Sequence, residues 1–218
     1  MKNNALVLYI HGKGGTAEEV EHYNPLFSHC DVVGLAYSAE TPWEAKAEFP
    51  VAVASLSEGY DSVILIANSI GAYFSMYALP QEKIEKAYFI SPIVDMEKLI
   101  CSMMNWANVS ENELREKGTI ETAFGETLSW EYLCWVRSHP IHWTVPTEIL
   151  YGGQDNLTDL ETITAFANSH DASLTVMENG EHWFHTLEQM EFLDAWITAL
   201  KTERLILRRR RESDAGLH

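Results

Sequence analysis

Six short apolar runs, rich in Val, Ile and Leu, recur along this chain and constrain its fold more than any other feature. Each run is short enough to be a strand buried on both faces of a sheet. Most runs are separated by stretches in which apolar residues recur at helical spacing. Strands that alternate with helices predict an α/β fold, with a mostly parallel sheet covered on both sides. The expected strands are residues 5–10, 31–37, 62–68, 87–93, 148–151 and 173–177, and the expected helices are residues 43–56, 70–79, 160–169 and 186–200.

One connection breaks this alternation. Residues 95–145 separate the fourth expected strand from the fifth, and a connection of that length is too long for a plain crossover. We interpret the segment as an inserted helical cap. With 218 residues, 46% of them hydrophobic, the chain has the size and composition of one globular domain. The sequence therefore predicts one domain over residues 1–200 that contains the cap, followed by a basic tail at residues 201–218.

The charge of the chain is negative and unevenly distributed. The formal net charge is −17, yet the last 18 residues hold six of the 15 basic residues and only three of the 32 acidic ones. Residues 1–200 therefore hold nine basic and 29 acidic residues, a net charge of −20. A body this acidic repels phosphate backbones, so no nucleic-acid partner is expected. A neutral or weakly charged small-molecule substrate is favoured instead.

The three cysteines, Cys30, Cys101 and Cys134, are odd in number and widely spread. They predict neither a disulfide framework nor a zinc site, and three reduced, buried thiols are the simpler interpretation. The histidines that no motif claims show no metal-ligand spacing, so neither a metal nor a cofactor is expected. No early segment resembles a secretory signal, and no apolar run approaches the roughly 20 residues that span a bilayer. We expect a cytoplasmic protein without a membrane partner, and its oligomeric state stays open.

A serine lies between an expected strand and an expected helix, in the run Ala67-Asn68-Ser69-Ile70-Gly71. This run resembles the nucleophile elbow of the α/β-hydrolase family, whose pattern is Gly-x-Ser-x-Gly. Gly71 matches the second glycine, and Ala67 replaces the first. Small residues at these two positions let strand and helix pack closely around a serine in a strained backbone conformation. The resemblance implies that Ser69 is a nucleophile.

A hydroxyl nucleophile needs a base within hydrogen-bond reach, and the base needs a third group to fix its tautomer. The resemblance implies Asp155 as the acid, in a Gly-rich turn after the fifth strand, and His182 as the base, after the last strand. The order Ser, Asp, His is that of α/β-hydrolases. His185 is a competing base, but it is expected in the first turn of the final helix. Asp159 and Asp171 are competing acids, which fit a helix start and a turn before the last strand.

The loop after the first strand reads His11-Gly12-Lys13-Gly14-Gly15 and looks like the His-Gly loop of the same family. By that resemblance, the backbone N–H groups of Lys13 and Ile70 would form the oxyanion hole, which stabilises charge on the carbonyl oxygen. A phosphate-binding turn is the alternative. The loop lacks the spacing of both a P-loop and a dinucleotide fingerprint.

The expected cap is rich in aromatic and thioether side chains, which adapt well to irregular apolar ligands. These side chains either line a substrate pocket or form the core of the cap itself. The pocket candidates, in the cap and beside the expected catalytic loops, are His11, Met103, Trp106, Trp135 and Trp183.

The resemblance covers residues 5–200 and implies an α/β-hydrolase sheet that lacks the family's first two strands. It also implies a carboxylesterase-like serine hydrolase that cleaves ester bonds of small to medium apolar acyl or aryl substrates through an acyl-enzyme. Hydrolysis of a thioester, an amide or a C–C bond next to a carbonyl stays open, because the fold does not choose among them. A non-catalytic binding protein on the same fold also stays open.

The C-terminal tail has a separate resemblance. Residues 202–209, followed by Glu212-Ser213-Asp214-Ala215, look like the first strand and truncated start of a GNAT N-acetyltransferase. Eighteen residues cannot form that fold, so a solvated basic arm is the simpler physical description. No catalytic role is expected for it.

Overall fold

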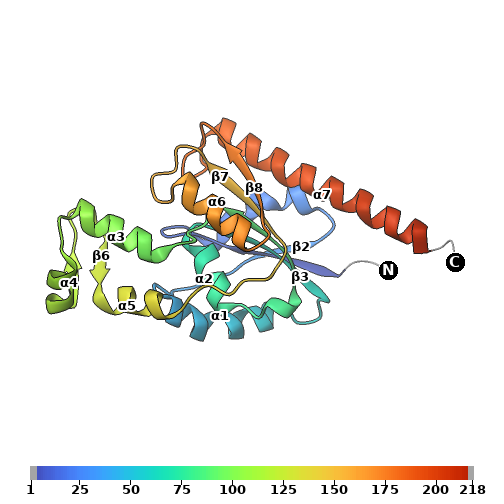
Figure 1. The fold of residues 1–218 in the computed structure, drawn as a ribbon. Helices are drawn as coiled ribbons and strands as arrows, with labels where there is room; N and C mark the ends of the chain where they lie inside the picture. The colour runs from blue at the N-terminus through green and yellow to red at the C-terminus, as the bar shows by residue number, and fades with distance from the viewer. Residues whose placement is uncertain (1–3, 216–218) are drawn as a thin grey trace.

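The structure is a computed structural model that describes the backbone of residues 4–215 and the side chains of residues 4–202. At its centre lies a six-stranded sheet in the order β2-β1-β3-β4-β7-β8, in which every neighbouring pair is parallel (Figure 1). This sheet confirms the predicted α/β class. Its strands are β1 (Ala5–Ile10), β2 (Asp31–Gly34), β3 (Ser62–Asn68), β4 (Ile84–Ile90), β7 (Thr147–Gly152) and β8 (Ser173–Met177).

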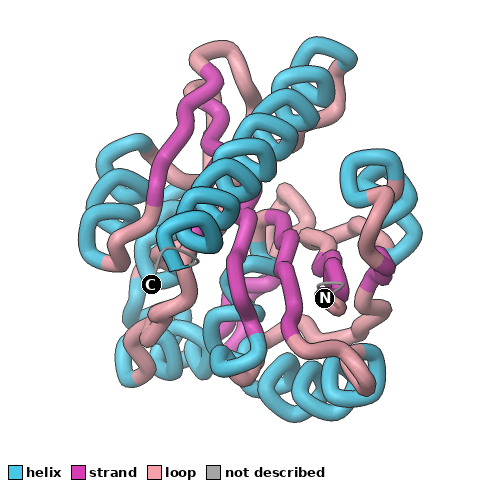
Figure 2. Tube along the Cα trace, turned by 90° about the vertical axis from the view of Figure 1, so that its right-hand side faces the viewer, coloured by secondary structure: helices cyan, strands magenta, loops and turns pink. Residues whose placement is uncertain are grey.

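Two separate hydrophobic clusters cover the two faces of the sheet. Successive side chains of a strand point to opposite faces, so Ile64 and Ile66 of β3 enter one cluster while Leu65 and Ala67 enter the other. The long C-terminal helix crosses the first of these faces (Figure 2). That face is covered by η1 (Ala17–Tyr23), η2 (Pro25–Phe27) and α7 (Leu187–Ala215), and the other by α1 (Pro42–Leu56), α2 (Ile70–Ala78) and α6 (Leu160–Ser169).

The start of α1 shows how local sequence fixes an element. Thr41 is the N-cap, and its side chain accepts a hydrogen bond from the Glu44 backbone N–H at 3.3 Å. The Glu44 carboxylate in turn accepts the Thr41 N–H at 3.0 Å. Pro42 occupies the first helical position, where no N–H is required. This capping box sets the first turn of the helix.

The segment between β4 and β7 forms a lobe beyond the carboxyl ends of the strands, on the left in Figure 1. Its helices are α3 (Met96–Trp106), α4 (Glu111–Lys117) and α5 (Trp130–Ser138). The sequence predicts helices here, but the lobe also contains an antiparallel hairpin of β5 (Thr119–Glu121) and β6 (Thr127–Ser129). Gly125 provides the left-handed residue that its turn requires, with φ 84°.

Arg137 joins the three helices of this lobe. Its guanidinium on α5 donates to Glu97 of α3 at 2.7 Å and to both carboxylate oxygens of Glu111 on α4 at 2.8 and 2.9 Å. These carboxylates raise the pKa of Arg137 further above its usual range. The bidentate contact fixes the orientation of α4 as well as its position.

Three expected elements have bounds that differ from the structure by more than one residue. Strand β2 ends at Gly34 rather than at residue 37, because η1 crosses there: a Cβ on Gly34 would lie 2.0 Å from the Ala17 carbonyl oxygen. Strand β4 covers Ile84–Ile90 rather than residues 87–93, because Ser91, with φ 44°, turns the chain out of the sheet. Helix α7 continues through the expected boundary at residue 200.

The resemblance of the tail to an acetyltransferase implies a strand at residues 202–209. The backbone there is helical, as part of α7 (Leu187–Ala215). No helix within the described part of the chain combines the length and the hydropathy that crossing a bilayer requires.

Candidate active site

The candidate site lies where the strand order reverses. The chain leaves β1 for the edge strand β2 and then returns to β3 on the other side of β1. In open parallel sheets, such a switch point leaves a crevice at the carboxyl ends of the strands, where ligands bind. Ile10 of β1 pairs with Ala67 of β3, so the loops that follow these strands begin side by side.

Ser69 lies at this edge of the sheet, between the end of β3 and the start of α2. Its backbone has φ 50° and ψ −120°, a conformation that non-glycine residues rarely adopt. Its N–H donates to the Ile90 carbonyl at 3.0 Å, and its carbonyl accepts the Ile93 N–H at 3.2 Å. Gly71 packs so closely that a Cβ there would lie 2.2 Å from the His11 carbonyl oxygen. The close packing of Gly71 against the loop after β1 therefore leaves no room for a larger residue at this position.

His182 and Asp155 meet Ser69 in a continuous chain of hydrogen bonds. The Ser69 Oγ lies 2.8 Å from His182 Nε2, and His182 Nδ1 lies 2.7 Å from Asp155 Oδ2. The Asp155 carboxylate is 0% exposed and the His182 side chain 15% exposed. The second Asp155 oxygen accepts the backbone N–H groups of Leu157 at 2.8 Å and Thr158 at 3.1 Å. This arrangement can transfer the serine proton to the imidazole while the carboxylate stabilises the charged ring.

Glycines let the loops that carry Asp155 and His182 touch through their backbones. The Gln154 N–H donates to the Gly180 carbonyl at 2.8 Å. A Cβ on Gly152 would lie 2.4 Å from the carbonyl oxygen of Glu181, so a side chain there would separate the two loops. The Gly-rich turn at the end of β7 therefore sets the spacing between the loops that carry Asp155 and His182.

The loop His11–Gly15 lies against the elbow. A Cβ on Gly12 would lie 3.2 Å from the Ser69 Cβ, and the Gly12 carbonyl accepts the Gly15 N–H at 3.1 Å. Within the described residues, neither the Lys13 nor the Ile70 backbone N–H donates a hydrogen bond. Two such free donors next to a nucleophile are what an oxyanion hole requires.

The Lys13 side chain contacts the inserted lobe. Its ammonium group forms an ion pair with Glu126, which lies in the hairpin turn 113 residues further along the chain. The tip of the hairpin is therefore held against the loop that carries one candidate oxyanion donor.

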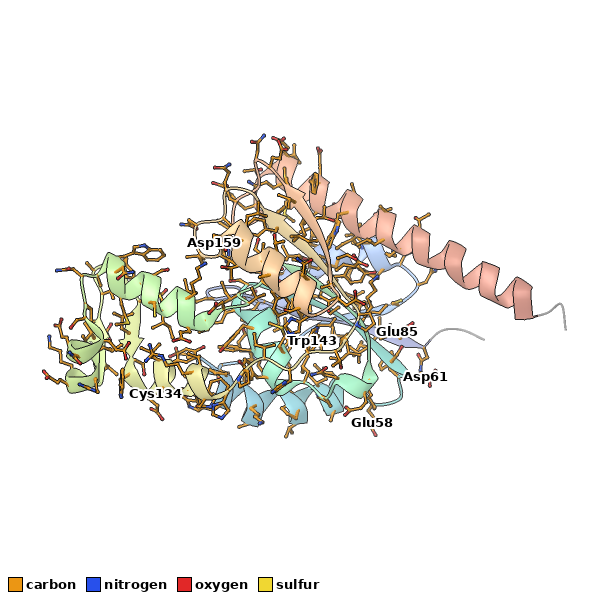
Figure 3. The ribbon with its side chains drawn as sticks, viewed as in Figure 1. Glu58, Asp61, Glu85, Cys134, Trp143 and Asp159 are labelled. Carbon is orange, nitrogen blue, oxygen red and sulfur yellow. The ribbon has the colours of Figure 1, made fainter. Side chains whose placement is uncertain are left out.

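The competing acids and base take structural positions. His185 bonds the Trp183 carbonyl through Nδ1 at 2.7 Å and lies before α7 rather than in its first turn, which corrects that expectation. Asp159 is the N-cap of α6 and pairs with Lys98 at 2.6 Å, and this contact lowers the Asp159 pKa to about 2. Figure 3 shows Asp159 at the end of α6 that faces α3. Asp171, with φ 51°, lies in the turn before β8.

A cavity of about 630 Å³ opens beside His182. The loop Lys13–Gly15 borders one side, Trp183 and Phe184 border another, and Tyr9 also lines it. Of the five pocket candidates, only Trp183, which is 71% exposed, lines this cavity.

The other pocket candidates pack elsewhere. His11 is buried and stacks on Tyr37, with ring centroids 4.2 Å apart. Met103 packs against the main core cluster. Trp106 is exposed near Phe124, and Trp135 stacks on His139 at 4.1 Å.

The cysteines are free thiols, but they are not buried as the sequence suggests. Cys134 is exposed on α5 (Figure 3), while Cys30 and Cys101 are half-buried. Among the described residues, no three His, Cys, Asp or Glu side chains lie where they could share a metal ion.

Sequence reasoning misses three polar residues beside the elbow: Tyr9, Glu19 and Asn68. The Tyr9 hydroxyl accepts from the Asn68 side chain at 2.9 Å and donates to Glu19. The spacing Thr16-x-x-Glu19 is a capping-box pattern and would have marked Glu19 as a residue fixed next to the His-Gly loop. No local signal links Tyr9 to Asn68, because the two belong to different strands.

No protein-family model matches this sequence, and no curated protein matches it either. Solved structures do match its fold. Est1E from Butyrivibrio proteoclasticus has a TM-score of 0.72 at 16% identity, over 94% of this chain and 90% of that one. Alpha/beta hydrolase domain-containing protein 10 from mouse has a TM-score of 0.71 at 14% identity, over 91% and 90%. The Pyrococcus furiosus esterase PF2001 has a TM-score of 0.61 at 16% identity, over 92% and 81%. The chain therefore has the α/β-hydrolase fold.

Proposed function

We propose that this chain is a carboxylesterase-like serine hydrolase that cleaves ester bonds of small to medium apolar acyl or aryl substrates. The observation that carries the proposal is the hydrogen-bond chain from Ser69 through His182 to the buried Asp155, with distances of 2.8 and 2.7 Å. A serine, a histidine and a carboxylate in this relation recur in hydrolases of unrelated folds, so geometry identifies the triad better than sequence does.

The reaction follows from these positions. Ser69 Oγ attacks the ester carbonyl carbon while His182 Nε2 takes the hydroxyl proton, and the N–H groups of Lys13 and Ile70 stabilise the oxyanion. His182 then gives this proton to the leaving alkoxide as the C–O bond breaks, which leaves an acyl group on Ser69. A water molecule then gives a proton to His182 and attacks the acyl carbon. As the bond from that carbon to Ser69 Oγ breaks, His182 returns the proton to Ser69 and the acid is released. Asp155 holds the imidazole tautomer throughout and stabilises its charged form.

The substrate class rests on charge and on the neighbours. A net charge of −17 disfavours anionic substrates at long range. The cavity beside His182 has aromatic side chains in its wall, among them Tyr9, Trp183 and Phe184. Est1E binds ferulic acid in one solved structure, and PF2001 is described as an esterase. These neighbours support including an aryl ester, such as a ferulate, among the substrates to be assayed.

The test combines active-site labelling with turnover. The parent protein and its Ser69→Ala and His182→Ala variants are treated with a fluorophosphonate, and intact masses are recorded. Nitrophenyl esters of increasing acyl length, an alkyl ferulate and an acyl thioester of matched length are assayed in parallel. We expect one adduct on the parent, mapped to Ser69, and ester turnover that both substitutions abolish.

The outcomes separate the alternatives. A folded parent that gives neither an adduct nor turnover contradicts the proposal and favours a binding protein on the same fold. Turnover of the thioester well above that of the oxygen ester of equal length would instead identify a thioesterase. Labelling that survives Ser69→Ala would remove Ser69 from the mechanism.

A further inference from the structure

The loop His11–Gly15, which carries the candidate oxyanion donor Lys13, is held by contacts at both of its ends. On the side of the elbow, Gly71 lies against the His11 carbonyl, and Gly12 lies against Ser69. The Tyr37 hydroxyl adds a hydrogen bond to the same His11 carbonyl at 2.7 Å. These contacts fix where the loop begins, but none of them reaches its second half.

Glu19 of η1 holds the second half. Its Oε1 accepts the Thr16 backbone N–H at 3.3 Å, at the end of the loop. Gly15 lies so close that a Cβ there would be 2.7 Å from the same oxygen, so the absence of a side chain lets the carboxylate cover the loop. Oε2 accepts the hydroxyl of Tyr9, which lies on β1 just before the loop. One carboxylate therefore joins the residues on both sides of the loop.

The network continues to the nucleophile. The Asn68 side-chain N–H donates to the Tyr9 hydroxyl at 2.9 Å, and Asn68 directly precedes Ser69. Tyr9 is 1% exposed, and burial raises its pKa well above the usual value, so its hydroxyl remains a donor at any working pH. The hydrogen bonds thus run from the elbow through β1 to the far end of the oxyanion loop.

We infer that Glu19, acting through Tyr9, is a positioning residue that fixes the position of the Lys13 backbone N–H relative to Ser69. This inference rests on the proposed function, because it assigns Glu19 a part in the same reaction. Oxyanion donors act through preorganisation, so a small displacement of the loop weakens the transition state more than the bound substrate. Nothing in the network requires Glu19 to touch the substrate.

The competing explanation is structural: Glu19 and Thr16 form a capping box, which stabilises η1 alone. Glu19→Ala, Glu19→Gln and Tyr9→Phe separate the two roles, with Glu21→Gln as the control. Glu21 lies on the same helix, is exposed, and its removal changes the charge equally. The readouts are kcat and KM for one nitrophenyl ester, and the amide hydrogen exchange rate of Gly15.

We expect Glu19→Ala and Tyr9→Phe to lower kcat by about 10- to 100-fold, since a displaced donor costs less than a deleted one. KM should stay within about twofold of the parent value. Glu19→Gln keeps one acceptor oxygen, so its kcat should fall less than that of Glu19→Ala. The double variant that combines Glu19→Ala with Tyr9→Phe should lose no more kcat than Glu19→Ala alone, because both changes break one network. Gly15 exchange should accelerate in Glu19→Ala and Tyr9→Phe but not in Glu21→Gln.

An unchanged kcat with a lower unfolding midpoint would reduce Glu19 to a helix cap and overturn the inference. A raised KM with unchanged kcat would also overturn it, because Glu19 and Tyr9 line the cavity beside His182 and would then contact the substrate. If the parent shows no turnover at all, the proposed function has failed, and the exchange rate still decides the positioning role. Unaltered Gly15 exchange in Glu19→Ala would then reject it.

Discussion

The ends of the neighbouring strands β3 and β4 are alike in backbone and unlike in chemistry. Each strand is followed by a serine with positive φ, 50° for Ser69 and 44° for Ser91. Ser69 Oγ meets His182 at 2.8 Å. Ser91 is 1% exposed, and its hydroxyl has no hydrogen-bond partner among the described residues. A serine with positive φ at a strand end therefore does not by itself bring its hydroxyl to a histidine.

Ser69 and Ser91 differ in the loops that pack against the ends of their strands. The loop after β8 brings His182 over Ser69, with Asp155 behind it. At Ser91 the N–H continues the sheet by donating to the Leu150 carbonyl at 2.8 Å, and the chain then turns into α3. At Ser91 the positive φ accompanies a change in chain direction, whereas at Ser69 it accompanies a hydroxyl that lies 2.8 Å from His182 Nε2.

The largest expected effect is the difference in ester turnover between alanine variants of the two serines. Ser69→Ala is expected to lower ester turnover by about 10⁴-fold or more, because it removes the nucleophile. Ser91→Ala should leave turnover within about threefold, since the alanine keeps the backbone and the hydroxyl has no partner. Steady-state rates on one nitrophenyl ester measure both. Comparable losses in the two variants would mean that strain, not the histidine partner, marks the site.

The next prediction tests the hydrogen bonds that link Ser69 through His182 to Asp155. Asp155→Asn should lower kcat by about 10³- to 10⁴-fold, since the amide cannot hold the reactive tautomer of His182. Asp159→Asn is the matched control, from the same loop, and asparagine remains a good N-cap for α6. Its kcat should match that of the parent. An active Asp155→Asn variant would point to another acid.

A third change tests the close approach at the elbow. Gly71→Ala places a methyl group 2.2 Å from the His11 carbonyl oxygen, so it should destabilise the fold by about 1–3 kcal/mol. Ala67→Gly, which restores the first glycine of the motif, should cost at most about 1 kcal/mol. Urea unfolding monitored by circular dichroism gives both values. A tolerated Gly71→Ala would show that the loop after β1 can move away.

A smaller effect concerns the stability contributed by Ser91. Removing a buried hydroxyl without a partner should leave the free energy of unfolding unchanged or raise it by up to about 1 kcal/mol. Urea midpoints of the parent and Ser91→Ala measure this difference. A clear loss of stability in the variant would mean that the hydroxyl has a partner in solution.

The smallest effect lies in the ion pair that joins the helix after Ser91 to the acid loop. Lys98 of α3 holds the pKa of Asp159 at about 2, below its ordinary value of 3.8. A depressed folded-state pKa contributes stability above the unfolded value, and that stability is lost as the pH falls from about 4 to about 2. Both side chains are half-exposed, so the change should be small. The stability of Asp159→Asn should change less across this window than that of the parent.

The sequence predicts the sheet well where apolar runs are short and clearly bounded. The bounds of β1, β3 and β8 agree with the expected residues 5–10, 62–68 and 173–177. The sequence does not predict the hairpin of β5 and β6, because three-residue strands are too short to show an alternating pattern. The end of β4 is misjudged because Pro92, Ile93 and Val94 extend the apolar run beyond the point where Ser91 leaves the sheet.

The sequence by itself determined the α/β class, the small residues of the elbow, and the order in which Ser69, Asp155 and His182 follow their strands. These depend on local composition and on the rule that parallel strands end at one edge. Only the tertiary structure decided the hydrogen-bond distances, the contact of Lys13 with Glu126, and the network from Asn68 through Tyr9 to Glu19. Each of these joins residues from separate elements, and packing between elements leaves no periodic trace in the sequence.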